Sequence, residues 1–217
     1  MPLLADGVYI QDDDYNFEIA VTYQLKYLVE TALLSLDLIE SPDNIAVKKF
    51  VNRAQYYRFY LDHLFYCFGQ INDRFVMKYV KDQKVQMIKA EHIKLNRTNY
   101  RFTEEQFEIL SKKLPRNIIE HLDERNLATI KKRSAVGGFN VISENSDLEM
   151  IESINKFPEC YPYTLNLINK TVIFYDIQQK QSCKKKFIIA LLQLRNELEE
   201  LKENIEQFDQ ILHDNWF

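Results

Sequence analysis

An arginine, an asparagine and a histidine lie within six residues, at Arg116, Asn117 and His121, in a chain with four His. An imidazole with a pKa near neutrality can act as general base or general acid. A guanidinium binds phosphate oxygens bidentately and keeps its charge, and a short amide can orient the imidazole or hold a phosphate oxygen. Cutting RNA without a metal requires a base for the 2′-hydroxyl, a cation for the phosphate and a proton for the leaving oxygen. Arg116, Asn117 and His121 are of the residue types that could supply these groups.

The residue before the triad, Pro115, predicts where these side chains stand. Proline suits the first helical position and disfavours helical geometry at the residue before it, Leu114. Arg116 and Asn117 would then lie at a positively polarised helix start, which attracts phosphate. On a regular helix Asn117 and His121 share a face, whereas Arg116 is rotated by about 140° from His121. Because they lie on different faces of the helix, Arg116 and His121 can meet on one phosphate in two ways. Both side chains can reach a cleft at the helix start, or two copies of the motif can face each other across a dimer.

The Arg-Asn-x-x-x-His spacing at 116–121 resembles the signature of the HEPN superfamily, helical bundles of which many cut RNA without a metal. The resemblance implies a homodimer with a composite cleft, in which Arg116 binds phosphate, Asn117 is the polar residue after it and His121 is the acid–base group. It implies no cofactor and no metal ligands. It also implies a setting in bacterial toxin–antitoxin or phage-defence systems, with an antitoxin-like protein partner. The alternative is a non-catalytic HEPN-like module that binds a protein or a nucleotide.

Three acidic residues surround the histidine: Glu120, Asp123 and Glu124. A carboxylate beside His121 would raise its pKa and fix its orientation, but three carboxylates also repel a phosphate backbone. Arg116 and Glu120 are spaced as an i,i+4 ion pair. A charged, solvated helix therefore remains the alternative interpretation of the motif.

The net charge of −4 gives no global attraction to RNA, so binding would depend on local basic clusters. Two such clusters flank the motif and a third lies further along: Lys112 and Lys113; Lys131, Lys132 and Arg133; and Lys184, Lys185 and Lys186. Singly, each is more often a solvated element end. Arg58 and His63 repeat the Arg-to-His spacing without the polar residue after the arginine. We interpret them as packing or surface residues; the alternative is that they line the same cleft from the second helix.

The composition favours long helices around an aromatic core. The 217 residues include four Gly and five Pro, so turns are few, and 13 Tyr and 14 Phe supply aromatic volume. The three cysteines show no CxxC spacing, and Cys67 lies in an apolar helical run, where we expect a buried thiol. No apolar segment reaches the roughly 18 residues of a membrane span, so we expect a cytoplasmic protein without a membrane partner.

Apolar periodicity predicts the elements. We expect one helix from Phe17 to about Ile39 and a second from Asp43 or Asn44 to about Val80. Thr103 and Gln106 form a capping box that would open a third helix reaching Leu114. Val85 to Leu95 lacks clear helical periodicity and could hold a short strand.

The C-terminal half mixes element types. Leu148 to Ile154 is a candidate short helix, and β-branched runs around Asn169–Lys170 predict a hairpin. From Ser182 to His213 leucines recur three and four apart, which predicts a long helix that packs on its own bundle or on another chain. The fold expected is a single, mainly α domain. It comprises a HEPN-like helical bundle over 16–126, a small β-hairpin insertion over about 139–178 and a C-terminal helix over 182–214.

Overall fold

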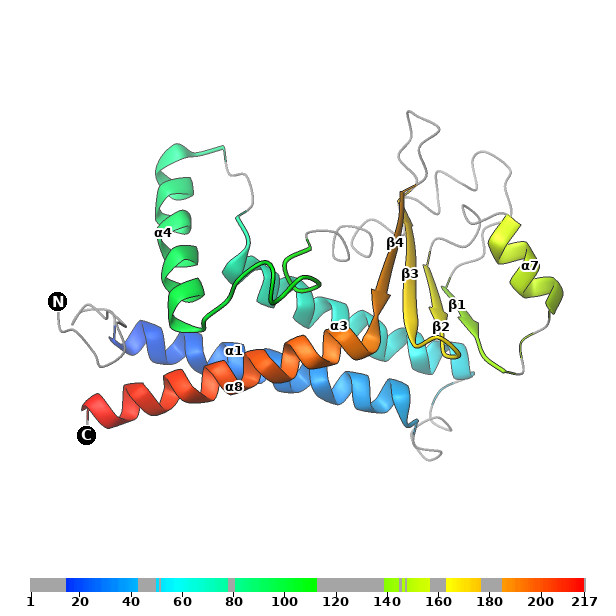
Figure 1. The fold of residues 1–217 in the computed structure, drawn as a ribbon, viewed down its shortest axis with the longest axis horizontal. Helices are drawn as coiled ribbons and strands as arrows, with labels where there is room; N and C mark the ends of the chain where they lie inside the picture. The colour runs from blue at the N-terminus through cyan, green and yellow to red at the C-terminus, as the bar shows by residue number, and fades with distance from the viewer. Residues whose placement is uncertain are drawn as a thin grey trace. The chain divides into compact units, whose positions relative to one another are not determined.

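A computed structural model of the chain describes residues 15–42, 50, 52–77, 81–112, 139–144, 146, 148–156, 163–176 and 185–216. Helices account for 68% of these residues, so the expectation of a mainly α protein is confirmed. The helices are α1 (Tyr15–Glu40), α3 (Arg53–Phe75), α4 (Gln83–Asn99), α7 (Leu148–Lys156) and α8 (Leu191–Trp216) (Figure 1). The strands are β1 (Phe139–Ile142), β2 (Tyr163–Asn166), β3 (Thr171–Asp176) and β4 (Lys185–Ala190). None of the described helices has a stretch both long and apolar enough to cross a bilayer.

The chain divides into two compact units, each made of separated segments. The first contains Met1–Leu34, Tyr66–Lys113 and Arg195–Phe217, and the second contains Ser35–Phe65 and Leu114–Leu194.

An aromatic stack forms the centre of the first unit. Phe102 stacks on Phe75 with ring centroids 4.3 Å apart and on Phe107 at 4.5 Å. Tyr100 meets the edge of Phe208 on α8 at 5.1 Å. These rings join α3, α8 and the loop after α4, so the segment that follows α4 is fixed to the helices by apolar contact.

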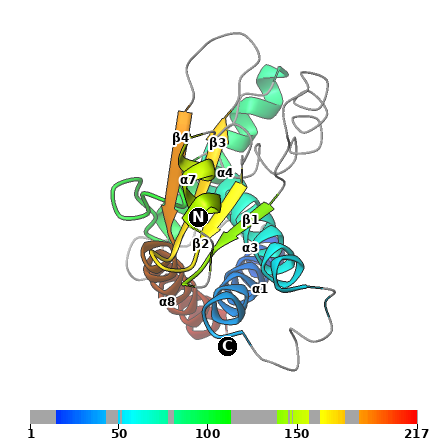
Figure 2. The ribbon, with the colours of Figure 1, turned by 90° about the vertical axis from the view of Figure 1, so that its right-hand side faces the viewer.

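A four-stranded sheet in the order β1-β2-β3-β4 organises the second unit (Figure 2). β1 pairs with β2 in parallel, and the other two pairings are antiparallel. Because side chains alternate between faces, the register puts Tyr163, Phe174 and Phe187 on one face. Phe65 of α3 packs against that face, 5.1 Å from the Phe174 ring. The aromatic residues of the sequence therefore build the sheet's core.

Several predicted elements are confirmed. The first helix, the short helix beginning at Leu148 and the hairpin around Asn169–Lys170 are all present. Lys170 has a positive φ of 48°, and the side chain of Asn166 accepts a hydrogen bond from the Asn169 amide at 3.0 Å. The apolar stripe of α8 is buried within the chain itself at Leu194, Leu198, Leu201, Ile205, Phe208 and Leu212. The stripe therefore packs on its own chain.

The strand expected over Val85–Leu95 is wrong, because this stretch belongs to α4. Asp82 caps the helix by accepting hydrogen bonds from the amides of Lys84 and Val85. The buried residues of α4 are confined to its second half, at Ile93, Asn96 and Asn99. A helix that packs along only half its length has a weak apolar period, which is why the pattern was ambiguous.

The predicted start of the C-terminal helix at Ser182 is also wrong. Residues 185–190 form β4, which pairs antiparallel with β3, and the helix begins at Leu191. The hairpin is thus part of a larger sheet, completed by β4 on one side and β1 on the other. Phe187, Ile188 and Ile189 favour a strand because aromatic and β-branched side chains suit a pleated surface.

Two further helix boundaries differ from the prediction. The second helix begins at Arg53, where the side chain of Asn52 accepts a hydrogen bond from the Gln55 amide at 2.9 Å. The expected third helix is a run of turns. Half of its predicted capping box is present: Thr103 accepts a hydrogen bond from the Gln106 backbone amide at 3.2 Å, whereas the Gln106 side chain donates to Glu200. Val80 and Leu114, the expected ends of the second and third helices, lie outside the described residues. The second helix, α3, ends at Phe75.

Candidate functional site

The three motif residues, Arg116, Asn117 and His121, lie outside the described residues, as do Lys113, Lys131, Lys132, Arg133 and Lys184. Lys185 and Lys186 lie in β4, where the strand register places them opposite Asp176 and Tyr175 of β3. Of the residues predicted to bind RNA, Lys112 is therefore the one that lies within the described residues.

Lys112 is partly exposed and held by a carboxylate. Its Nζ lies 2.8 Å from Oε1 of Glu108, four residues earlier in the sequence. An exposed pair of this kind contributes little stability, but it partly cancels the positive charge that Lys112 would offer a phosphate.

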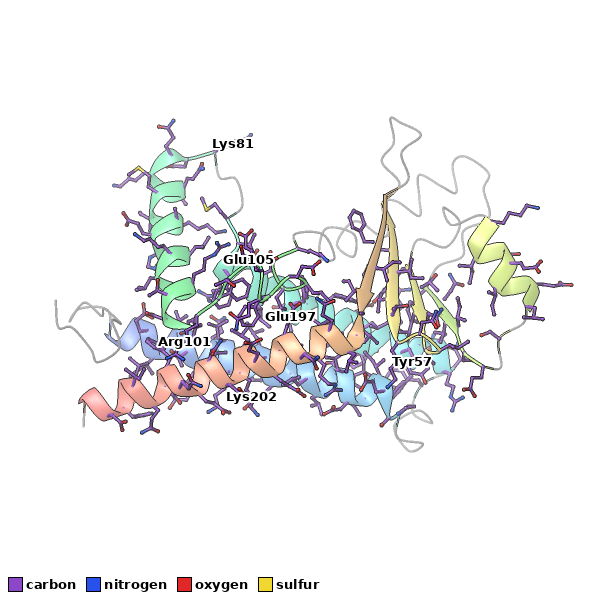
Figure 3. All side chains as sticks on the ribbon, viewed as in Figure 1. Tyr57, Lys81, Arg101, Glu105, Glu197 and Lys202 are labelled. Atoms are coloured by element: carbon purple, nitrogen blue, oxygen red, sulfur yellow. The ribbon has the colours of Figure 1, made fainter. Side chains whose placement is uncertain are left out.

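The segment before the motif, residues 103–112, is anchored to α8 by a buried carboxylate. We call it the anchored segment. Glu197 accepts hydrogen bonds from the amide of Ile109 at 3.0 Å and from that of Leu110 at 2.9 Å. Glu197 is 4% exposed, and Figure 3 places it on the part of α8 beside this segment. Gln106 also donates to Glu200 on the same helix.

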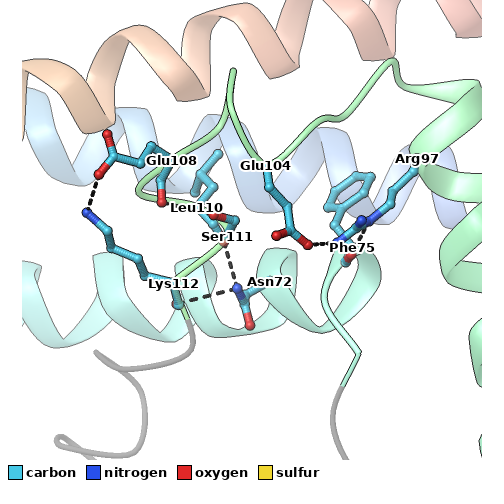
Figure 4. Close-up of polar contacts among 8 residues, drawn as sticks. All are labelled: Asn72, Phe75, Arg97, Glu104, Glu108, Leu110, Ser111 and Lys112. Carbon is cyan, nitrogen blue, oxygen red and sulfur yellow. Dashed lines mark hydrogen bonds and ion pairs between the residues drawn. The ribbon is translucent and has the colours of Figure 1, made fainter.

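The other side of the anchored segment is attached to α3 and α4 (Figure 4). The side-chain amide of Asn72 donates to the carbonyl of Leu110 at 2.6 Å and to that of Lys112 at 3.4 Å. Arg97 donates to the carbonyl of Phe75 at 2.6 Å and pairs with Glu104 at 2.6 Å. The backbone four residues before Arg116 is therefore fixed by side chains from two directions.

Glu197 and Asn72 were not singled out in the sequence, although a signal existed. Glu197 stands between Leu194 and Leu201 at helical spacing, and Asn72 stands likewise between Phe68 and Phe75. A polar residue within an apolar stripe is buried with the stripe and must find hydrogen-bond partners there. In this case those partners are backbone groups of the anchored segment.

A second buried polar group lies at the C-terminal end of α4. The hydroxyl of Thr22 donates to the carbonyl of Glu18 at 2.7 Å, so the Tyr100 hydroxyl donates to Thr22 at 2.9 Å. Burial raises the pKa of Tyr100 well above its ordinary value; the Thr22 hydrogen bond opposes that rise and the nearby Glu18 carboxylate adds to it. This tyrosine is therefore a neutral structural donor and no acid–base catalyst at neutral pH.

The second Arg-to-His pair lies at the surface, one of the two placements that we inferred for it. Arg58 lies 3.5 Å from Asp62 in an exposed i,i+4 pair, and the exposed His63 ring stacks on Phe59 at 5.6 Å. Cys67 is buried as expected, and burial raises the pKa of its thiol to about 11. Within the described residues, no group of three or more His, Cys, Asp or Glu is placed to hold a metal ion.

A scan of the chain against protein-family models gives no match, and searches of curated proteins and of solved structures give none either. The HEPN resemblance therefore rests on the motif residues themselves.

Proposed function

We propose that the chain is a metal-independent endoribonuclease of HEPN type that acts as a homodimer. The observation that carries the proposal is the Arg-Asn-x-x-x-His spacing at 116–121, directly after Pro115. His121 takes the proton of a 2′-hydroxyl, whose oxygen attacks phosphorus and displaces the 5′-oxygen of the next nucleotide. Arg116 stabilises the charge on the phosphate, and the 5′-oxygen leaves with a proton from an imidazolium.

The mainly α architecture supports this proposal in general terms. More specific support comes from the anchored segment, because a motif that must align three side chains benefits from a fixed approach of the chain. Asn72 and Glu197 hold the backbone up to Lys112, four residues before Arg116.

An exposed apolar stripe on α1 supports the homodimer. Tyr23, Tyr27 and Leu34 are 54%, 66% and 57% exposed, and their positions on a regular helix fall within about 40° of one another. Large apolar side chains on one helical stripe are a frequent feature of protein interfaces. The variant Tyr27→Glu should shift the chain from dimer to monomer in light scattering, whereas Met87→Glu on α4 should leave the dimer intact. A wild-type monomer at assay concentration contradicts the homodimer.

The decisive experiment is cleavage of single-stranded RNA in EDTA by the wild type and by His121→Ala. We expect cleavage with 2′,3′-cyclic phosphate ends that falls by at least 100-fold in His121→Ala, the scale of a lost acid–base group. His63→Ala is the matched control, because His63 has the same spacing from an arginine and is exposed. Undiminished cleavage in His121→Ala, or no cleavage by the wild type, refutes the mechanism.

The non-catalytic binding module is favoured by one observation, the pairing of Lys112 with Glu108. A lysine whose charge is already partly cancelled suits a protein partner better than RNA. Absence of cleavage together with an intact Tyr27-dependent dimer would select this second function. A toxin or phage-defence role with an antitoxin-like partner belongs to the first proposal and stands or falls with it.

A further inference from the structure

A cavity of about 250 Å³ lies in the first unit, and its chemistry is unrelated to the motif at 116–121. One wall is α4, and the remaining lining comes from the last turn of α3 and from Val21 of α1. The α4 residues that line it recur at helical spacing: Val85, Ile88, Lys89, His92, Ile93 and Asn96. The cavity therefore follows one face of this helix.

The outer part of that face is apolar and open. Val85 and Ile88 are 49% and 47% exposed, whereas Ile93 and Asn96, further along the helix, are buried. From Val85 to Asn96 the helix rises by about 16 Å. Lys81, just before the helix, marks the outer end of α4, and Arg101, just after it, marks the inner end (Figure 3). The cavity thus joins an exposed apolar lip to a polar, buried floor.

Two cations line the cavity, and the lining offsets one of their two charges. The Arg74 guanidinium donates a hydrogen bond to the side-chain oxygen of the neutral Gln24. The side-chain amide of Asn96 donates to the backbone carbonyl of Arg74 at 3.0 Å. Lys89 is half-buried and makes no ion pair with any residue that the structure describes. Asp73 is the one carboxylate in the lining. With His92 counted as neutral, the lining carries one net positive charge.

We propose that this cavity binds a small organic carboxylate, with its head group at Arg74 and Lys89 and its apolar body along Val85 and Ile88. A single net positive charge matches one carboxylate better than a doubly charged phosphate ester. The volume lies just below the range of pockets for drug-sized ligands, which limits the ligand to on the order of ten non-hydrogen atoms. Partial burial of the cations makes a charge-assisted hydrogen bond to the carboxylate stronger than it is in open water.

Octanoate is a suitable probe, because it combines one carboxylate with an apolar chain of this size. We expect a Kd on the order of 0.1–1 mM in a titration of the full chain followed by amide chemical shifts, a value typical of small ligands. The shifts should concentrate at residues 85–96 of α4. Octylammonium, which has the opposite charge, and octanol, which has none, should bind at least tenfold more weakly. Equal binding of the three compounds, or shifts spread over the whole chain, overturns the proposal.

Two pairs of variants separate the charge from the apolar lip. Lys89→Met should weaken octanoate binding by about tenfold, the scale of one charge-assisted hydrogen bond. Lys94→Met, on the same helix but outside the cavity, should not change it. Ile88→Glu should abolish binding by repelling the carboxylate, whereas Met87→Glu, at the adjacent exposed position, should leave it intact. None of the four positions is buried, so each variant should keep the helical circular dichroism of the wild type.

Unchanged affinity in both Lys89→Met and Ile88→Glu refutes the site. Because none of these residues belongs to the motif at 116–121, loss of octanoate binding and loss of RNA cleavage are separate outcomes.

Discussion

Replacing Glu197 tests how the buried carboxylate holds the anchored segment. Its two oxygens accept from the Ile109 and Leu110 amides at 2.9–3.0 Å, and both of these residues are buried, at 2% and 0% exposure. In Glu197→Gln one oxygen can still accept from both amides, but the charge is lost. A hydrogen bond to a charged group contributes about 1.5–3 kcal/mol and a neutral one about 0.5–1.5 kcal/mol.

The two bonds together would lose about 2–3 kcal/mol on that basis, and relief of the carboxylate's desolvation returns part of it. We therefore expect Glu197→Gln to lower the free energy of unfolding by about 1–2 kcal/mol. Glu197→Ala should lower it by about 3–5 kcal/mol, because two buried amides lose their acceptor and a cavity remains.

The assay is urea unfolding followed by circular dichroism, with hydrogen exchange at the amides of Ile109 and Leu110. Glu203→Gln and Glu203→Ala are the matched controls, because Glu203 is exposed on the same helix, and we expect changes within about 0.5 kcal/mol. Exchange at the two amides should accelerate most in Glu197→Ala. If Glu197→Ala is no less stable than Glu203→Ala, the reasoning about the anchored segment is refuted.

Three further predictions concern buried ionisable groups. The Tyr163 hydroxyl is buried and has no hydrogen-bond partner among the described residues, so Tyr163→Phe should raise stability by about 1 kcal/mol in urea unfolding. Tyr100→Phe should lower stability by a similar amount, because this variant loses the hydrogen bond between the Tyr100 hydroxyl and Thr22. A loss of stability in Tyr163→Phe together with a gain in Tyr100→Phe would contradict these two hydrogen-bond assignments. Burial raises the pKa of both tyrosines above that of the unfolded chain, near 10. The contribution of the two tyrosines to the free energy of unfolding is therefore complete below pH 10 and is lost above it, by about 1.4 kcal/mol per pH unit for each tyrosine. Urea midpoints from pH 8 to 11 should show this fall, and a smaller one in each Phe variant. The Cys67 thiol, with a pKa of about 11, should resist a disulfide reagent at pH 8 in a variant whose other cysteines are serines, and should react once urea unfolds the chain. Rapid labelling of the folded variant would refute this.

Elements with a complete local signal were predicted correctly. The first helix carries an uninterrupted apolar stripe, and the hairpin carries two β-branched runs around a turn, so their patterns require no distant partner. The α8 stripe was visible in the leucine spacing. Thr103 and Gln106 were identified as a cap because capping depends on residues three apart.

Elements whose type depends on distant partners were mistaken. β4 pairs with β3, and the local strand preference of Phe187, Ile188 and Ile189 runs without a break into the helix that begins at Leu191, so the sequence alone did not separate the two elements. α4 packs along half its length and so shows half a pattern. Turns replace the third helix where Glu197 and Asn72 provide hydrogen-bond partners for the backbone.

The sequence by itself determined the mainly α class, the burial of Cys67 and the chemical types gathered at Arg116, Asn117 and His121, because these depend on local composition and spacing. Only the tertiary structure decided that α8 packs within its own chain and that Glu197 anchors the segment before the motif. It alone brought Arg74 and Lys89 to one cavity. Such pairings join residues that are far apart in the chain, and their geometry depends on packing that no local pattern encodes.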